Sequence, residues 1–328
     1  MKCTVLQYAA LTLVAAGCGA PEQAREPVNL ALLSPIPAPT KPAGIDDYRR
    51  GEQALLSGDY PGAKTAFEAA LVKQPDRSEA HSYLAAALEQ LGDSAGAEAH
   101  YKVALSKKPD LVHSLSNLSA LYLDATRFQD CATLLDKPEV LKVGSPELYF
   151  NLGLARAGLK ETKGAEAAFR VAIERAPTQV NYRIALAQAL GDGNRVLEAV
   201  SELRAAREHA KSDAAALRLI GATFRELRAA NECITTFDGL IALKDEGLSR
   251  FERGLCKFAN KDGAGATEDM KRALDLDPKL ALAHYWLGVI AMGEKNTPEA
   301  KERLSKYLEL EPSGTKTKEA QARLKALP

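Results

Sequence analysis

The residue types that carry most enzymatic and metal chemistry are sparse in this chain. Histidine occurs five times, at His81, His100, His113, His209 and His284. None of them follows another histidine or a cysteine at the short spacing of a zinc site, so we expect no metal and no cofactor. Gly153–Lys160 has the outline of a phosphate-binding loop, but Leu159 stands where that loop needs lysine. These patterns do not indicate an enzyme.

One cysteine stands where covalent chemistry is expected. A basic start and the nine-residue apolar run Tyr8–Ala16 lie just before Cys18. Nine residues cannot cross a bilayer as a helix, but they suit the apolar region of a secretory signal. The sequence Ala15-Ala16-Gly17-Cys18 resembles the lipobox of bacterial lipoproteins.

The lipoprotein resemblance implies that residues 1–17 are a signal peptide, cleaved before Cys18, and that this cysteine carries lipid. Several acyl chains make attachment effectively permanent, at about 0.8 kcal/mol per buried CH₂. Gly19 replaces the Asp that signals inner-membrane retention in enteric bacteria. The resemblance therefore implies an outer-membrane anchor facing the periplasm. A plain signal peptide with an incidental cysteine is the alternative.

Residues 18–43 are predicted to be a proline-rich tether. Six prolines occur in this stretch, at Pro21, Pro27, Pro35, Pro37, Pro39 and Pro42. Because proline has no backbone donor and a fixed φ, this segment is expected to be extended. It would hold a folded body away from the membrane surface.

The rest of the chain has a period of 34 residues. Pro75 and Pro109 lie 34 residues apart, and Pro278 and Pro312 repeat that interval. This period resembles the tetratricopeptide repeat, a helix-turn-helix hairpin with proline near its end. With the proline at repeat position 32, eight repeats fill residues 44–314 and start at 44, 78, 112, 146, 180, 214, 247 and 281. The resemblance implies an all-α fold, a right-handed superhelical solenoid of about eight hairpins.

The proline at position 32 sets the register of the repeats, and residues at other repeat positions support it. Position 8, where the two helices of a hairpin must approach closely, is small in all eight repeats: Gly51, Ala85, Ser119, Gly153, Ala187, Gly221, Gly254 and Gly288. Position 16 holds Asp59, Asp93, Asp262 and Asn296, residues that cap helix starts. Gly58 and Gly92 stand just before two of them as helix-stop residues.

Two repeats depart from the pattern, and a tail follows the last one. Pro138 should end the second helix of repeat 3 near Asp136 and leave a kinked or looped connection. Repeat 6 lacks its proline and is one residue short. Residues 315–328 are predicted to form a polar capping helix, with Leu324 and Leu327 covering the last repeat.

Three cysteines remain in the folded body. Cys131, Cys233 and Cys256 occupy small positions of the repeat, so burial as small apolar residues is expected. Cys233 and Cys256 belong to successive helices and could also form a disulfide in an oxidising periplasm. Sequence alone does not choose between these two states.

The charge composition and the extent of the repeats indicate which class of molecule the protein binds. The 43 basic and 43 acidic side chains cancel, so no overall field attracts nucleic acid. The repeats and the tail occupy residues 44–328 and leave no room for a catalytic domain. A protein or peptide partner is therefore expected, with contact to the membrane through the lipid anchor alone.

In tetratricopeptide repeats the first helix, helix A, lines the concave face. Carried onto this sequence, the resemblance places these residues in a partner groove: Asn117, Phe150, Asn151, Leu248, Phe251, Leu255, Phe258, Tyr285, Val289 and Met292. Apolar residues gathered on one surface usually mark an interaction site. The alternative is that the apolar members pack against neighbouring hairpins or form a dimer contact.

These patterns favour a non-enzymatic adaptor of the bacterial envelope that binds a partner segment and assists assembly of a complex such as a pilus secretin. A second hypothesis is an accessory module that orients cell-wall glycan or a peptidoglycan hydrolase, with Phe150, Phe251 and Tyr285 stacking on sugars. A third is a cytoplasmic scaffold with a spurious leader.

Overall fold

The computed structural model describes residues 45–328 of the chain. The predicted signal peptide, Cys18 and the tether lie outside the described residues. The chain divides into two compact units, the first ending at Pro177 and the second beginning at Thr178. Each unit is described by itself.

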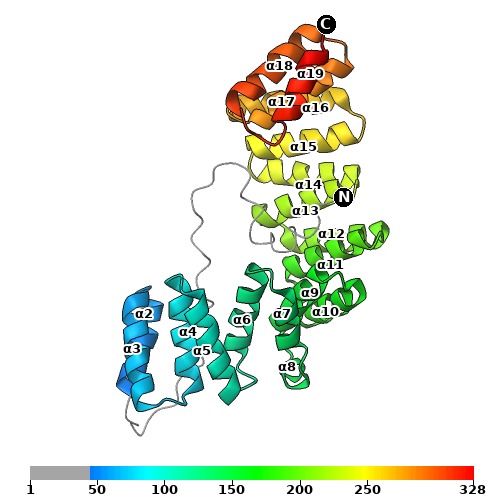
Figure 1. Ribbon diagram of the computed structural model, residues 1–328. Coiled ribbons are helices and arrows are strands. Elements are labelled where there is room, and N and C mark those ends of the chain that lie inside the picture. The colour runs from blue at the N-terminus through cyan, green and yellow to red at the C-terminus, as the bar shows by residue number, and fades with distance from the viewer. Residues whose placement is uncertain (1–44) are drawn as a thin grey trace. The chain divides into compact units, whose positions relative to one another are not determined.

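The first unit contains nine described helices (Figure 1): α2 (Ile45–Leu56), α3 (Tyr60–Lys73), α4 (Ser78–Gln90), α5 (Ser94–Lys107), α6 (Val112–Asp124), α7 (Phe128–Leu135), α8 (Pro138–Val143), α9 (Pro146–Gly158) and α10 (Thr162–Arg175). The second unit also contains nine: α11 (Val180–Asp192), α12 (Val196–Ala210), α13 (Ala214–Glu226), α14 (Ala230–Leu243), α15 (Gly247–Ala259), α16 (Gly263–Leu276), α17 (Ala281–Gly293), α18 (Thr297–Leu310) and α19 (Thr317–Ala326). No strand occurs in the part of the chain that the structure describes.

The helix starts follow the 34-residue register. Helix α2 begins one residue after the first predicted repeat start, and α4, α6, α9, α11, α13, α15 and α17 begin at the other seven starts. Each of these helices is followed by an antiparallel partner, which gives eight helix-turn-helix hairpins among residues 45–310. The all-α class and the hairpin repeat are therefore confirmed.

Glycine at position 8 makes room for a large ring of the same hairpin. A Cβ atom placed on Gly51 would lie 2.7 Å from the ring of Phe67. The equivalent distance is 2.5 Å from Gly153 to Phe169 and 2.6 Å from Gly221 to Phe237. Interiors packed this closely have no space for an added methyl group. The small residue thus lets the bulky residue at position 24 seal the hairpin.

The expected caps form where the repeat places them. The side chains of Asp59, Asp93 and Asp262 each accept a hydrogen bond from the backbone N–H three residues later, over 2.8–2.9 Å. Asn296 makes the same bond to the N–H of Glu299, over 3.3 Å. Each cap satisfies an amide that the helix itself leaves unpaired.

The residue before each cap position adopts a left-handed backbone conformation in all eight repeats. Glycine meets this requirement twice, at Gly58 (φ 76°) and Gly92 (φ 84°). The other six repeats use a residue with a side chain, with φ between 56° and 66°: Thr126, Lys160, Asn194, Arg228, Lys261 and Lys295. Among these, Thr126 is the β-branched residue, for which positive φ is least favourable.

Substituting Thr126→Gly is therefore expected to raise the free energy of unfolding by about 0.5–1 kcal/mol. Relief of the left-handed strain outweighs the extra chain entropy of glycine in the unfolded state. Chemical denaturation followed by circular dichroism measures the change. Thr133→Gly, inside α7, is the matched control and should lower stability, because Thr133 is also exposed but helical. A loss of stability in both variants would contradict the prediction.

The two irregular repeats, 3 and 6, differ in how the chain connects them to the next repeat. In repeat 3, α7 ends at Leu135 and Asp136 caps it, as predicted from Pro138. The connection that follows is not a plain loop, since Pro138 starts the short helix α8, whose Val140 is buried. In repeat 6, Lys244 leaves α14 with extended backbone, and α15 begins three residues later at Gly247.

The tail forms helix α19, which lies against α18. Leu324 and Leu327 pack on a buried cluster that includes Tyr285, Leu304 and Tyr307. The backbone N–H of Lys316 donates to the hydroxyl of Tyr307 over 2.9 Å, which fixes the start of the helix. None of the described helices combines the length and apolar character needed to cross a bilayer.

Candidate protein-interaction surface

Two of the predicted groove residues are part of the core. Phe251 is 3% exposed and packs in a cluster with Met270, Ala283 and Leu287. Tyr285 is 1% exposed and packs with Leu304 and Tyr307. The expectation that these rings face a partner is therefore wrong. At position 5 the side chain of helix A turns into the space between hairpins, where the aromatic ring supplies core volume.

The other apolar residues predicted in the second unit remain partly accessible. Leu248 is 40% exposed at the start of α15. Leu255 and Phe258 of α15 and Val289 and Met292 of α17 are half-buried and pack on the two clusters. These four half-buried residues lie around Leu282 and Trp286, which contact both clusters. We call this surface the tryptophan face, formed by Leu255, Phe258, Leu282, Trp286, Val289 and Met292.

Trp286 is the residue that sequence reasoning missed. Its ring lies 5.5 Å from that of Phe258 and 5.6 Å edge-on from that of Tyr285, between centroids. It is half-buried, so one part of the indole packs on the core while another part meets solvent. The available signal was its position: the single tryptophan of the chain stands at position 6 of repeat 8.

The predicted residues of the first unit hold hairpins together. The amide nitrogen of Asn117 donates to the hydroxyl of Tyr101 over 3.0 Å, and that of Asn151 donates to Ser119 Oγ over 2.8 Å. Both bonds join one repeat to the preceding one. The ring of Phe150 packs against Phe169, with centroids 5.8 Å apart. These side chains are half-buried structural contacts, and the glycan hypothesis loses two of its three aromatic residues to the core.

A disulfide joins the sixth and seventh hairpins. Cys233 of α14 and Cys256 of α15 are bonded, with Cα atoms 5.9 Å apart, a usual separation for a disulfide. Both cysteines are fully buried. Of the two states that the sequence left open, the structure has the bond. Cys131 is a free, buried thiol, and burial raises its pKa to about 12, so it is not a reactive nucleophile.

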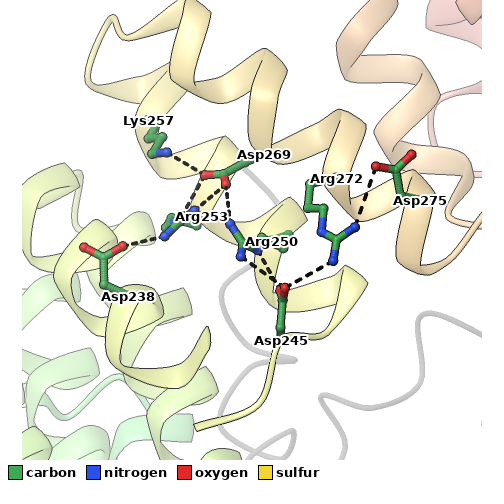
Figure 2. A network of polar contacts seen from close by, with 8 residues as sticks. All are labelled: Asp238, Asp245, Arg250, Arg253, Lys257, Asp269, Arg272 and Asp275. Atoms are coloured by element: carbon green, nitrogen blue, oxygen red, sulfur yellow. Dashed lines mark hydrogen bonds and ion pairs between the residues drawn. The ribbon is translucent and has the colours of Figure 1, made fainter. Parts of the chain in front are cut away.

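A network of charged side chains connects α15 to α14 and to α16 (Figure 2). Its centre is Asp269 of α16, whose side chain is 1% exposed. Arg253 and Lys257 of α15 each bond to its carboxylate over 2.8 Å, and Arg250 approaches to 3.5 Å. Burial alone would raise the pKa of Asp269, but hydrogen bonds from Arg253 and Lys257 outweigh it and hold the pKa below its ordinary value of 3.8. The carboxylate is therefore ionised and fully paired.

The network extends from Asp269 in two directions. Arg253 also bonds to Asp238 of α14 over 2.7 Å. Arg250 bonds over 2.7 Å to Asp245, in the shortened connection before α15. This hydrogen bond holds the pKa of Asp245 below its usual range. Helix α15, which carries Leu255 and Phe258 of the tryptophan face, is thus fixed to α14 by the disulfide and to α14 and α16 by ion pairs, and Figure 2 shows these ion pairs.

Metal-binding potential is limited in the described part of the chain. Among residues 45–328, no three side chains of His, Cys, Asp or Glu gather into a metal site. Sequence spacing nevertheless failed to reveal one histidine pair. His81 and His100 are 19 residues apart in the chain, yet their Nδ1 atoms lie 2.9 Å apart across the hairpin of α4 and α5.

Comparison with known proteins agrees with this fold. Models of the tetratricopeptide repeat match residues 48–111 and residues 146–179. The structure of yeast Tom70 is similar with a TM-score of 0.53 and 17% identity, over 98% of this chain and 69% of that one. The pilF protein of Pseudomonas aeruginosa is similar with a TM-score of 0.50 and 18% identity, over 63% of this chain and 94% of that one. No curated protein matches the sequence. With its eight hairpins and the two matched segments, the chain is a tetratricopeptide-repeat protein.

Proposed function

We propose that this protein is a non-enzymatic adaptor of the bacterial cell envelope that binds a segment of a partner protein on the tryptophan face. The observation that carries the proposal is the half-buried Trp286, set among partly accessible apolar side chains of α15 and α17. Aromatic side chains that are already held in place on one side lose little entropy on binding and are frequent anchors of interfaces. Tetratricopeptide-repeat proteins commonly serve as protein-interaction scaffolds, which agrees with this role.

The charges beside the face indicate the chemistry of the partner. At the start of α19, Lys316 lies 5.7 Å from the ring centroid of Tyr285, which contacts Trp286. Glu319 pairs with Lys316 over 3.0 Å and with Arg323 over 2.8 Å, which leaves one positive charge in excess. The partner that fits is a segment with an apolar anchor followed by a carboxylate. It would belong to an envelope complex under assembly, such as a pilus secretin.

Photo-crosslinking in cells tests this proposal. With a photoreactive residue at Phe258, the chain is expected to give a cross-link to one partner, and Trp286→Ala should abolish it because the tryptophan face loses its indole ring. Leu197→Ala is the matched control, since Leu197 is 87% exposed and stands on α12 outside the face. Circular dichroism verifies that both variants fold. A cross-link that survives Trp286→Ala, or is lost equally in both variants, contradicts the proposal.

The adaptor is further proposed to be held at the outer membrane by lipid on Cys18. The lipobox-like sequence before this cysteine supports the anchor. The buried disulfide of the second unit supports an oxidising compartment, because such bonds rarely persist in a reducing cytoplasm. In cells fed a palmitate analogue, the wild-type chain should be labelled and Cys18→Ala should not be. Cys131→Ala should keep the label, and equal labelling of Cys18→Ala would remove the anchor from the proposal.

A further inference from the structure

The histidine pair of the second hairpin has a geometry that the adaptor role does not use. His81 lies on α4 and His100 on α5, with ring centroids 5.1 Å apart. The two Nδ1 atoms face each other over 2.9 Å. Both side chains are half-buried, so solvent and small ions reach them. The pair belongs to the first unit and is independent of the tryptophan face.

The hydrogen bonds of His81 fix which of its nitrogens is available. Its Nε2 lies 2.9 Å from the carbonyl oxygen of Pro75, which can only accept a hydrogen bond. The proton of neutral His81 is therefore on Nε2, and Nδ1 keeps its lone pair. In the pair as it stands, His100 donates its Nδ1 proton to that lone pair. A bond from the second ring nitrogen to a backbone carbonyl is also the usual support of a histidine that binds metal.

The surroundings favour a cation over a proton on the rings. Burial lowers the pKa of His100, with a smaller contribution from His81, so this imidazole stays neutral at neutral pH. The charges of Glu68 and Asp93 act on His100, and Asp76, which pairs with Lys107 over 2.6 Å, interacts more weakly with His81. A neutral imidazole with carboxylates nearby is suited to a transition-metal ion.

We propose that Nδ1 of His81 and Nδ1 of His100 together bind one divalent transition-metal ion of the zinc and copper class, with water completing its shell. Metal–nitrogen bonds of about 2.05 Å at a tetrahedral angle place the two nitrogens about 3.3 Å apart. The two Nδ1 atoms are now 2.9 Å apart, so they must separate slightly to bind the ion. Rotation of the two half-buried side chains provides this change. The proton on Nδ1 of His100 moves through solvent to Nε2 of the same ring, so the ion enters without net proton release.

Titration of the full-length chain with zinc chloride at pH 7.5, followed by calorimetry, tests the site. The wild type should bind one equivalent through the pair, and His81→Gln and His100→Gln should each weaken that step by at least about tenfold. His209→Gln is the matched control, because His209 is exposed on α12. Cys3 and Cys18 are the same in every variant, so the measured quantity is the binding step that depends on His81 and His100.

A second readout separates ligation from a change in folding. With copper(II) added to the full chain, electron paramagnetic resonance should show coupling to two imidazole nitrogens in the wild type and to one in either variant. Unchanged melting curves of the metal-free variants would establish that they are folded. If zinc binding and the copper spectrum are the same in the wild type and in both variants, the site does not exist.

Discussion

The variant Asp269→Ala is expected to lose about 3–5 kcal/mol of unfolding free energy. The substitution leaves Arg253, Lys257 and Arg250 around a position where their shared carboxylate was buried. The penalty comes from cations that have lost this shared buried carboxylate and cannot regain full hydration, although Arg253 keeps Asp238 and Arg250 keeps Asp245. Denaturation followed by tryptophan fluorescence measures it within the second unit, because Trp286 is the only tryptophan of the chain.

The control for this variant is Asp275→Ala. Asp275 is largely exposed and lies 3.9 Å from Arg272, so its removal should cost no more than about 1 kcal/mol. Losses of similar size in the two variants would mean that the buried network contributes no more than a surface ion pair.

The pH dependence of stability gives a second measurement of the contribution of Asp269. The pKa of Asp269 is lower in the folded protein than its ordinary value of 3.8. Its contribution to stability is therefore complete above about pH 4 and is lost as the pH falls through the folded-state pKa. The acid limb of the stability curve should be less steep in Asp269→Ala than in the wild type.

Removing the disulfide should cost about 3 kcal/mol. The bond closes a loop between residues that are 23 positions apart and so restricts the unfolded chain. The double variant Cys233→Ala with Cys256→Ala should therefore unfold at lower denaturant concentration than the oxidised wild type, by the same fluorescence measurement. Dithiothreitol should destabilise the wild type but leave the double variant unaffected.

Cys131→Ala provides the control for the disulfide. This thiol is buried and free, so its variant should keep its sensitivity to dithiothreitol. A wild-type curve that does not respond to reductant, under conditions where thiol titration verifies reduction, would contradict the predicted role of the bond.

The hairpins were predictable because their determinants recur every 34 residues and act locally. Asp59 can be recognised as a cap from its own neighbours, and its side chain bonds to an amide three residues later. Pro138 ends α7 for an equally local reason, since it cannot continue the helix that precedes it.

The candidate surface was harder to predict because exposure depends on how one hairpin leans on the next. Phe251 and Trp286 both stand on helix A at groove positions, yet the first is core and the second reaches solvent. The contacts of Asp269 cross from α16 to α15, and those of His81 cross from α4 to α5. A period shows which residues share a position, but it does not show which rotamers meet across helices.

The joint between α14 and α15 also bears on how the protein comes apart. Repeat proteins lose structure stepwise, because each repeat contacts only its neighbours. The disulfide and the ion pair of Arg253 with Asp238 prevent the sixth and seventh hairpins from separating in this way, and the buried Asp269 holds α16 to α15 within the seventh hairpin. They should open as a single cooperative block, the most slowly exchanging part of the second unit. A force that a partner exerts on the tryptophan face would then act on this block as a whole. It would not unfold helix α15 separately from its neighbours.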